Sequence, residues 1–277
     1  MARIRIYNFA RLNMVGHIPD KRQLIHDSVR TDEVAIHGKF RYGFFDATEF
    51  QLDGEDFAFG RLVKYKKLLE GEIVDEEEHE LIEGGLPQGV IAKSRFFIHY
   101  RSGVVAYRPI KSRLSEKQFR EITAEIINAA NQDFFVNTIL ESVDEEFEIK
   151  EALRRFQILS RISFNVHPTN PSNRDEYREL DERLKNLEAS RIQQVIEGGE
   201  NGLNLDSVLG DEAYKGVIMA ADGYGQASIS GELEGRHTTI NTSDSPYTAP
   251  VIFHEEPISD LEQLMPYFQR IWERMVE

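Results

Sequence analysis

Residues 93–107 read KSRFFIHY-RSG-VVAY, and the pattern of this stretch decides the fold class. Apolar residues in 95–101 alternate with basic and aromatic ones, which is the period-two pattern of a β-strand. Ser102-Gly103 can form a short turn because glycine tolerates a positive φ. Residues 104–107 then alternate again, so the stretch predicts an antiparallel hairpin.

A helix and a further strand are predicted directly after this hairpin. Ser115 precedes Gln118 by three residues, the capping-box spacing that satisfies free N–H groups at a helix start. Phe119 and Ile122 begin an apolar stripe at helical spacing, and residues 133–140 return as an apolar, aromatic strand. We therefore predict an α+β fold of mainly antiparallel sheet, with helices packed on one face and a ferredoxin-like ββαβ unit at the centre.

Length and composition indicate a soluble globular protein. The chain has 277 residues, of which 40% are hydrophobic and 29% charged. It has no cysteine, which excludes disulfides, thiolate metal sites and cysteine nucleophiles. The first residues are too polar for a signal peptide, and no run approaches the roughly 18–20 apolar residues that span a bilayer. We expect a cytoplasmic protein with no membrane contact, no cofactor and no metal.

The formal net charge of −15 disfavours general polyanion binding, but the charge is unevenly distributed. Residues 68–92 contain eight acids and no Lys or Arg, whereas residues 93–114 contain six Lys or Arg and no acid. The acidic segment is either a solvated loop or a flap over the basic hairpin. It ends at the glycines and proline of 84–87. Here we predict the junction between a β-rich N-terminal subdomain, residues 1–85, and an α+β subdomain, residues 86–277, packed intimately together.

The basic hairpin is the first candidate site, for nucleic acid or another polyanion. Basic side chains can hold phosphates while interleaved aromatic side chains stack on bases. The pattern loosely resembles a sheet-surface nucleic-acid reader of ferredoxin-like topology, without the aromatic consensus of the RNA-recognition motif. The alternative is a structural hairpin whose charges balance the acidic remainder. The candidate nucleic-acid-binding residues are Lys93, Arg95, Phe97, His99, Arg101, Tyr107, Arg108, Lys111 and Arg113.

Two histidines, each followed two residues later by threonine, form the second candidate site. His167-x-Thr169 and His237-x-Thr239 are similar to the twin motifs of two-histidine phosphoesterases, an RNA-processing family. The resemblance implies a phosphodiesterase or nuclease in which His167 and His237 act as general base and acid. Thr169 and Thr239 would contact phosphate. Pro168 interrupts the strand expected of the first motif.

Further predictions concern the second half of the chain. Residues 175–192 carry an amphipathic stripe and predict the longest helix, and residues 215–220 predict a buried strand. Residues 259–275 predict a closing amphipathic helix, which can serve the core or a dimer or partner surface. Asp133 with Glu148-x-Lys150 resembles the carboxylate-and-lysine set of metal-dependent nucleases.

A wider resemblance rests on the order of FAFGRLVKYKK (57–67), the basic aromatic hairpin and the helix capped by Ser115. Over roughly residues 1–210 this order resembles an uncharacterised bacterial family found among mobile-element and phage-defence genes. The resemblance implies a bacterial cytoplasmic protein in phage–host conflict, and it implies no mechanism.

These observations leave three hypotheses for function. The first is a non-enzymatic antiviral-defence protein that binds RNA, DNA or another polyanion through the basic hairpin. The second is a phosphodiesterase or nuclease effector that uses the two histidines. The third is an acidic protein-interaction component of a multi-protein complex, with a protein partner or a second copy of the chain.

Overall fold

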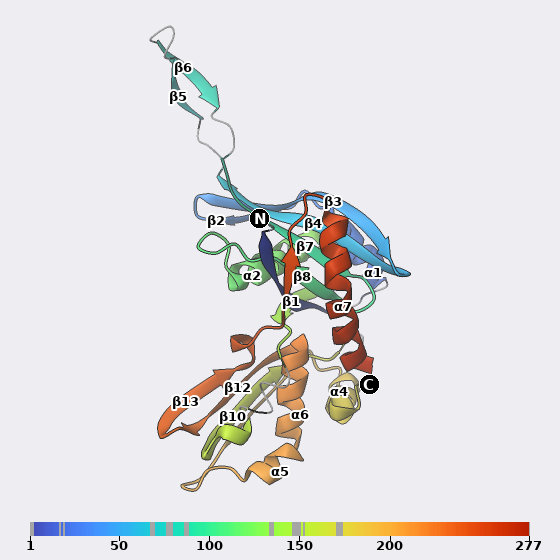
Figure 1. Cartoon of the computed structure of the whole chain (residues 1–277), viewed down its shortest axis with the longest axis vertical. Helices are drawn as coiled ribbons and strands as arrows, with labels where there is room; N and C mark the ends of the chain where they lie inside the picture. Colours follow the sequence, from blue (N-terminus) through green and yellow to red (C-terminus); the bar gives the residue numbers. More distant parts are fainter. Residues whose placement is uncertain are drawn as a thin grey trace.

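The structure is a computed structural model. It contains a large sheet, above in the view of Figure 1, and a smaller sheet below it. Helices and antiparallel strands are mixed along the chain, so the α+β prediction is confirmed. The residues that the structure describes are 3–16, 18, 20–66, 70–75, 80–85, 89–132, 136–145, 151, 153–169 and 174–276.

Strand β1 (Ile4–Val15) connects the parts of the large sheet. Its first half pairs with β14 (Thr248–Ile252) and its second half with β9 (Asn137–Ser142). On its other edge it pairs with β8 (Val104–Tyr107). From β8 the sheet continues outward through β7 (Gly89–His99), β4 (Glu55–Lys66), β3 (Phe40–Leu52) and β2 (Ala35–His37).

Helices cover both faces of this sheet, so the prediction of helices on one face only is wrong here. Helices α1 (Lys21–Val29) and α2 (Glu116–Ala130) share a core with Phe96 on one face. Helix α7 (Pro257–Val276) shares a core with Phe97 on the opposite face. A strand covered on both sides needs apolar residues at successive positions, which explains the Phe96-Phe97 pair.

Local signals determine where the two helices α1 and α2 begin. The Asp20 side chain accepts a hydrogen bond from the backbone N–H of Gln23. Ser115 and Gln118 form the reciprocal capping box that their spacing predicts. The predicted start of α2 is therefore confirmed, and both helices place an apolar face on the sheet.

The predicted subdomain junction near residue 85 is not a boundary between sheets. Strands β4 and β7, which lie on either side of it in sequence, are hydrogen-bonded neighbours in the large sheet. Between them, β5 (Glu70–Asp75) and β6 (Glu80–Gly85) pair with each other as a separate two-stranded unit that extends beyond the sheet in Figure 1. The chain thus leaves the large sheet after β4 and re-enters it at β7.

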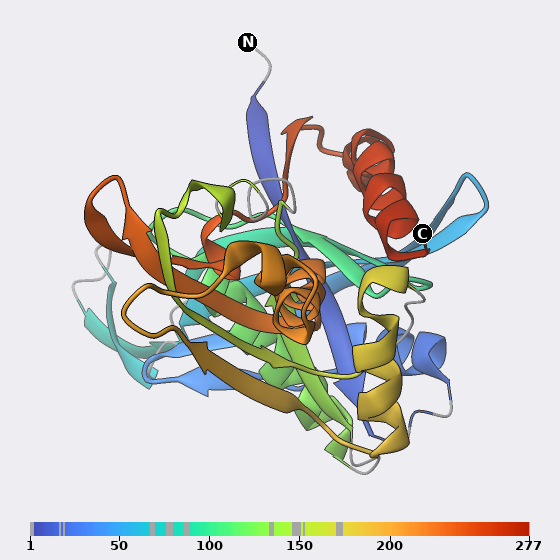
Figure 2. The ribbon, with the colours of Figure 1, turned by 90° about the horizontal axis from the view of Figure 1, so that it is seen from below.

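The smaller sheet consists of β11 (Ile192–Glu197), β10 (Ile158–Val166), β12 (Gly225–Leu233) and β13 (Arg236–Asn241), in that order. Alternate residues of β10 and β12 are buried and join the same core as α7 and the adjacent face of the large sheet. Apart from Ile158 and Leu233 at the strand ends, the other residues of these two strands are polar and at least partly exposed. Figure 2 shows the smaller sheet, with its helices, from below.

Two predictions for this region are wrong. Residues 215–220 belong largely to helix α6 (Glu212–Met219), not to a strand; a short apolar run does not distinguish the two. Asp211 caps the helix. The predicted helix over 175–192 is also too long, because α4 (Arg178–Asn186) ends before Glu188, whose φ is 51°, and the chain then forms β11. Short helices η2 (Asp175–Tyr177) and α5 (Leu205–Leu209) complete the layer.

Candidate functional site

The aromatic side chains of the predicted hairpin are not available at the surface. Phe97 and Tyr107 are both fully buried, on opposite faces of the sheet. Tyr107 stacks on Phe119 of α2 with ring centroids 4.2 Å apart. The prediction that these rings stack on bases is therefore wrong, because both faces of the hairpin are covered by helices.

His99 and Arg101 lie at the turn end of the hairpin and are engaged within the protein. His99 is buried, and its ring nitrogens contact the Ser102 hydroxyl at 2.8 Å and the Glu55 carboxylate at 3.1 Å. Burial lowers the pKa of His99 against the opposing effect of Glu55. Arg101 pairs with the same carboxylate and lies over the Trp272 ring. Neither residue is a free phosphate contact.

The remaining predicted residues divide into two groups. Lys111 and Arg113 are exposed in the turn that follows β8. Lys93, Arg95 and Arg108 lie at the far end of the hairpin, on the α7 side of the large sheet. This second group lies beside a further arginine, Arg61.

The cluster is a row of three arginines on adjacent strands, Arg61, Arg95 and Arg108, which we call the arginine row. Arg61 of β4 is directly opposite Arg95 of β7 in the strand register. Arg108 directly follows β8, and its backbone N–H donates to the backbone oxygen of Arg95. Like charges directly opposite one another in a sheet are destabilising, so the row has to be offset by partners.

Partners are supplied unevenly along the row. Arg61 contacts Asp46 at 2.5 Å in an exposed pair. Arg95 is buried and donates to the Asp260 carboxylate at 2.8 Å and to two backbone oxygens at residues 254–255. Arg108 donates to one backbone oxygen, that of Lys93 at 3.2 Å, and its buried Nε has no hydrogen-bond partner among the described residues. Burial lowers the pKa of Arg108.

Two aromatic residues flank the row. Phe45, opposite Arg61 on β3, is 44% exposed, although it is a large apolar side chain. Phe253 lies at the other end, with the guanidinium carbons of Arg95 and Arg108 at 4.6 and 5.9 Å from its ring centroid. Arg5 approaches the same ring at 5.5 Å, within the range of cation–π attraction. The surface therefore combines cations with two partly exposed rings.

Sequence reasoning missed Arg5, Phe45, Arg61 and Phe253. Arg61 alternates with apolar residues in the strand FAFGRLVKY, which was a visible signal for its face. What the sequence lacked was the pairing of β4 with β7, which places Arg61 beside Arg95. No local pattern connects Phe253 with β1 or β8.

The two histidine motifs lie at opposite ends of the smaller sheet. His237 is opposite Glu232, which is in turn opposite Ile158, at the first residue of β10. His167 directly follows the last residue of the same strand. Nine residues of extended strand span roughly 30 Å, so the two rings cannot act on one phosphate. The prediction that His167 and His237 act together as a catalytic acid–base pair is therefore wrong.

The other groups of these motifs already have structural roles. His167 is buried and donates through Nδ1 to the backbone oxygen of Ser190 at 2.9 Å. The Thr169 hydroxyl donates to Asp181 at 2.6 Å. Thr239 is exposed and shares a hydrogen bond with the Ser230 hydroxyl. Each of these groups is thus hydrogen-bonded within the protein.

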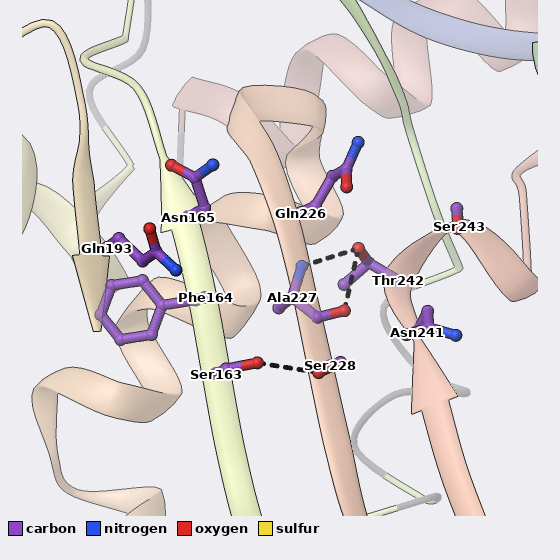
Figure 3. Close-up of a pocket in the computed structure, with 10 residues that line it drawn as sticks. All are labelled: Ser163, Phe164, Asn165, Gln193, Gln226, Ala227, Ser228, Asn241, Thr242 and Ser243. Carbon is purple, nitrogen blue, oxygen red and sulfur yellow. Dashed lines mark hydrogen bonds between the residues drawn. The ribbon is translucent and has the colours of Figure 1, made fainter. Parts of the chain in front are cut away.

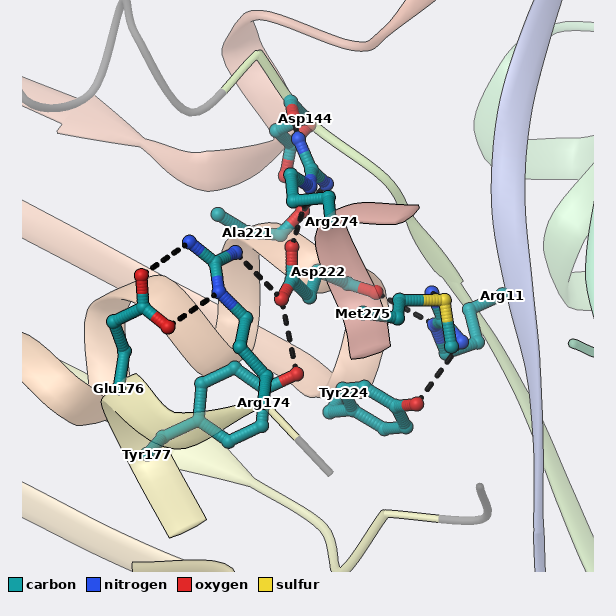
Figure 4. Close-up of polar contacts among 10 residues, drawn as sticks. All are labelled: Arg11, Asp144, Arg174, Glu176, Tyr177, Ala221, Asp222, Tyr224, Arg274 and Met275. Atoms are coloured by element: carbon teal, nitrogen blue, oxygen red, sulfur yellow. Dashed lines mark hydrogen bonds and ion pairs between the residues drawn. The ribbon is translucent and has the colours of Figure 1, made fainter. Parts of the chain in front are cut away.

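A second group of arginines lies in the interior, around the turn that joins α6 to β12; we call it the buried junction (Figure 4). Asp222 is fully buried and accepts hydrogen bonds from Arg174 at 3.0 Å and from the Tyr177 hydroxyl at 2.9 Å. Arg274 of α7 forms an ion pair with the other carboxylate oxygen at 2.8 Å. The junction thus ties α7 to the smaller sheet's layer.

Arg11 of β1 completes the buried junction from the large sheet. It is fully buried and donates to the backbone oxygen of Asp222 at 2.6 Å and to the Tyr224 hydroxyl at 3.0 Å. Gly223, with φ 83°, permits the close approach, because a Cβ there would lie 2.8 Å from the Arg11 Cβ. These contacts fix the smaller sheet to the large one and keep Arg11 and Asp222 fully buried, so we assign the junction a structural role.

Two observations limit other chemistry. Among the described residues, no three His, Asp or Glu side chains are grouped so as to hold a metal ion. Asp133, Glu148 and Lys150, the nuclease-like set, lie outside the described residues. Within the same described part of the chain, no helix is long and apolar enough to cross a membrane.

Comparison with known families identifies the family to which the chain belongs. Residues 5–263 match the family described as "Domain of unknown function (DUF4747)". The chain belongs to this family. A comparison with curated proteins found no match. The DUF4747 family has no assigned activity in its description, so function has to be argued from the geometry above.

Proposed function

We propose that this DUF4747 protein binds single-stranded nucleic acid on the face of the large sheet that carries the arginine row. The observation that supports the proposal most strongly is the side-by-side placement of Arg61, Arg95 and Arg108 on adjacent strands. Such a row repels itself unless anions lie over it, and regularly spaced phosphates supply those anions.

The charge balance of this surface favours an anionic ligand. Five cations gather here, and two carboxylates, Asp46 and Asp260, contact the row. Arg95 is already paired within the protein, so the cations that remain for phosphate are those on either side of it. The five cations of this surface are Arg5, Arg61, Lys93, Arg95 and Arg108.

Phe45 and Phe253 favour a single strand over a duplex. Single strands expose their bases, and base–aromatic stacking contributes about 1–3 kcal/mol per base with little dependence on sequence. A ring at each end of a row of cations matches this combination of stacking and phosphate binding. We therefore assign the base-stacking role that was predicted for Phe97 and Tyr107 to Phe45 and Phe253, which are partly exposed.

We further infer that the large sheet contains a ferredoxin-like unit made of β1, α1, β7, β8, α2 and β9. Support comes from the order β9-β1-β8-β7 with every neighbour antiparallel. It also comes from the position of both helices on one face. Strands β2, β3 and β4 would then be an insertion that extends the edge and supplies Arg61.

We also propose that the protein acts in the bacterial cytoplasm, in phage defence or with mobile elements. The support is the sequence resemblance over roughly residues 1–210 and not the arginine row itself. The test is a plaque assay on cells that express the wild-type chain or the Arg61→Gln/Arg108→Gln variant. Equal plaquing on wild-type and empty-vector cells, over a panel of phages, would contradict this role.

Binding is tested by fluorescence anisotropy with labelled single-stranded RNA, single-stranded DNA and duplex across a salt series. Each phosphate contact contributes about −0.7 to the slope of log K against log salt for a single strand. The Arg61→Gln/Arg108→Gln variant should bind about tenfold more weakly, and its slope should be less steep by about 1.4.

The matched control removes two exposed arginines elsewhere, Arg154 and Arg155. Their replacement by glutamine changes the net charge equally and should leave affinity and slope unchanged. Absence of binding at about 50 mM salt, where phosphate contacts are strong, contradicts the proposal. An equal loss in the control variant also contradicts it, because attraction would then be general and not local.

A further inference from the structure

Two neighbouring cavities lie where the smaller sheet meets α2 and β9; α2 is on the face of the large sheet opposite the arginine row. The first, of about 290 Å³, lies over the open face of the smaller sheet (Figure 3). The second, of about 450 Å³, lies between α2, β9 and β12. Gln226 and Ser243 line both. Their sizes are those of small-molecule sites.

The first cavity offers only uncharged polar groups. Its lining includes primary amides and hydroxyls and no charged side chain among the described residues. Amide side chains both donate and accept, and they pair with the edges of nucleobases, as Asn and Gln do with adenine. The amides are Asn165, Gln193, Gln226 and Asn241.

The second cavity adds charge at a short distance from these amides. Lys117, Arg120 and Glu121 of α2 line it, and so does Glu141 of β9; Lys117 forms an exposed pair with Glu121 at 3.7 Å. Among the described residues, the Arg120 side chain makes one hydrogen bond, a long contact of 3.4 Å to the Tyr107 hydroxyl. Glu141 accepts from the Gln226 amide at 3.1 and 3.3 Å, at the point where the cavities join.

Two buried oxygens in these linings have no protein partner. Thr138 is 2% exposed, and its hydroxyl oxygen has no hydrogen bond within the described part of the chain. The same holds for the side-chain oxygen of Asn165. A buried acceptor without a partner is destabilising, so a ligand with donor groups would relieve this cost.

We propose that these cavities bind a ribonucleotide, with the base against the amides of the smaller sheet and the phosphate at Lys117 and Arg120. Glu141, between the two, is placed to accept from the ribose hydroxyls, which is the role acidic residues take in dinucleotide sites. A neutral sugar would contact the amides of the first cavity and leave the cations of the second without a ligand. A simple anion would contact those cations and leave the amides without a ligand.

The test is isothermal titration calorimetry of the full chain with AMP, CMP, GMP and UMP, and with the four matching nucleosides. At least one monophosphate should bind with one site per chain. Its nucleoside should bind about tenfold to a hundredfold more weakly, because it loses charge-assisted hydrogen bonds to Arg120 and Lys117. Its 2′-deoxy form should also bind more weakly, through the lost contact with Glu141.

Two variants locate the site. Arg120→Gln should reduce the affinity of the monophosphate to that of the nucleoside, while leaving the nucleoside unchanged. Ser228→Tyr fills the first cavity from a partly exposed position and should abolish binding of both. Thermal melting of each variant confirms that it is folded. The control Arg61→Gln, in the arginine row, should bind nucleotide like the wild type.

Several results would overturn the proposal. These are absence of binding by all four monophosphates at millimolar concentration, a nucleoside that binds as tightly as its monophosphate, and unchanged binding by the Ser228→Tyr variant. The proposal is independent of nucleic-acid binding by the arginine row. The Ser228→Tyr variant should lose nucleotide binding and keep its affinity for oligonucleotides. The Arg61→Gln/Arg108→Gln variant should lose affinity for oligonucleotides and keep nucleotide binding, and these two results together would separate the proposals.

Discussion

The arginine row and the buried junction each gather three arginines, and they differ in the partners that surround them. At the junction, Arg174 and Arg274 converge on the fully buried Asp222, and Arg11 donates to its backbone. In the row, the three arginines are side by side on one sheet face. Only one of them, Arg95, is buried and fully paired. The same residue type therefore holds the fold together in one place and, on our proposal, binds an anion in the other.

The difference follows from the cost of burying charge. A buried charge is stable only when it is paired and hydrogen-bonded, so the junction has to be satisfied within the protein. A partly exposed guanidinium keeps much of its hydration and can remain available for a ligand. The predictions below test whether stability and binding divide between the two groups in this way.

The largest effect is expected from Asp222→Ala at the buried junction. Removing this carboxylate leaves Arg174 and Arg274 without their buried partner, and breaking such a pair costs about 3–5 kcal/mol. Urea denaturation followed by circular dichroism measures the free energy of unfolding. The matched control is Asp32→Ala, at an exposed position, which should change it by less than about 0.5 kcal/mol. Equal effects would mean that the junction is not structural.

Arg95 should behave like a junction residue although it belongs to the row. Arg95→Met removes three hydrogen bonds, one of them to the fully buried Asp260. We expect a loss of about 1.5–3 kcal/mol in the free energy of unfolding, the range for bonds to charged groups. Arg108→Met removes one 3.2 Å bond to a backbone oxygen and should cost less than about 0.5 kcal/mol. Similar losses for both variants would contradict the division.

Asp144 tests how far the buried junction depends on pH. This residue is buried beside Arg274, and burial raises its pKa well above the ordinary value of 3.8. The folded state therefore holds a proton that the unfolded state has lost, and stability should fall as pH rises from about 4 through the raised pKa. Asp144→Asn should remove this fall and stabilise the protein at pH 8 by about 1 kcal/mol or more.

Urea denaturation at pH 5 and pH 8 checks the prediction for Asp144. Glu179→Gln is the control, because Glu179 is exposed. Burial of Glu141 raises its pKa too, so the wild-type slope contains both carboxyls and only the difference between the two proteins reports on Asp144. A wild-type stability that rises between pH 5 and pH 8, or an unchanged slope in Asp144→Asn, would contradict this assignment.

Local rules predicted much of the large sheet's central part and little of its surface. The hairpin and the helix capped by Ser115 follow from alternation, a turn glycine and a capping box, all of which act within a few residues. The face on which Phe97 lies depends on α7, more than 150 positions further along the chain. Alternation says that two faces differ, and it does not say that a helix covers both.

The same limit explains the site residues. Arg95 and Arg108 were predicted as part of the basic stretch, and both lie in the row. Arg61 joins the row only because β4 pairs with β7. Phe253 lies beside the row only because β14 brings the chain back to β1. His167 and His237 failed for the complementary reason, since a shared local motif carries no information about distance along a sheet.

The smallest effect on stability is expected at Arg61, where the row is most exposed. Its pair with Asp46 has side-chain exposures of 30% and 56%, and such surface pairs contribute about 0–1 kcal/mol. A double-mutant cycle with Arg61→Gln and Asp46→Asn, measured by urea denaturation at low and high salt, should give a coupling energy below about 1 kcal/mol that salt reduces further. A salt-independent coupling of several kcal/mol would place Arg61 with the buried junction. Arg108 would then be the one arginine of the row left to offer a ligand, and the main reason to expect a phosphate over the row would be lost.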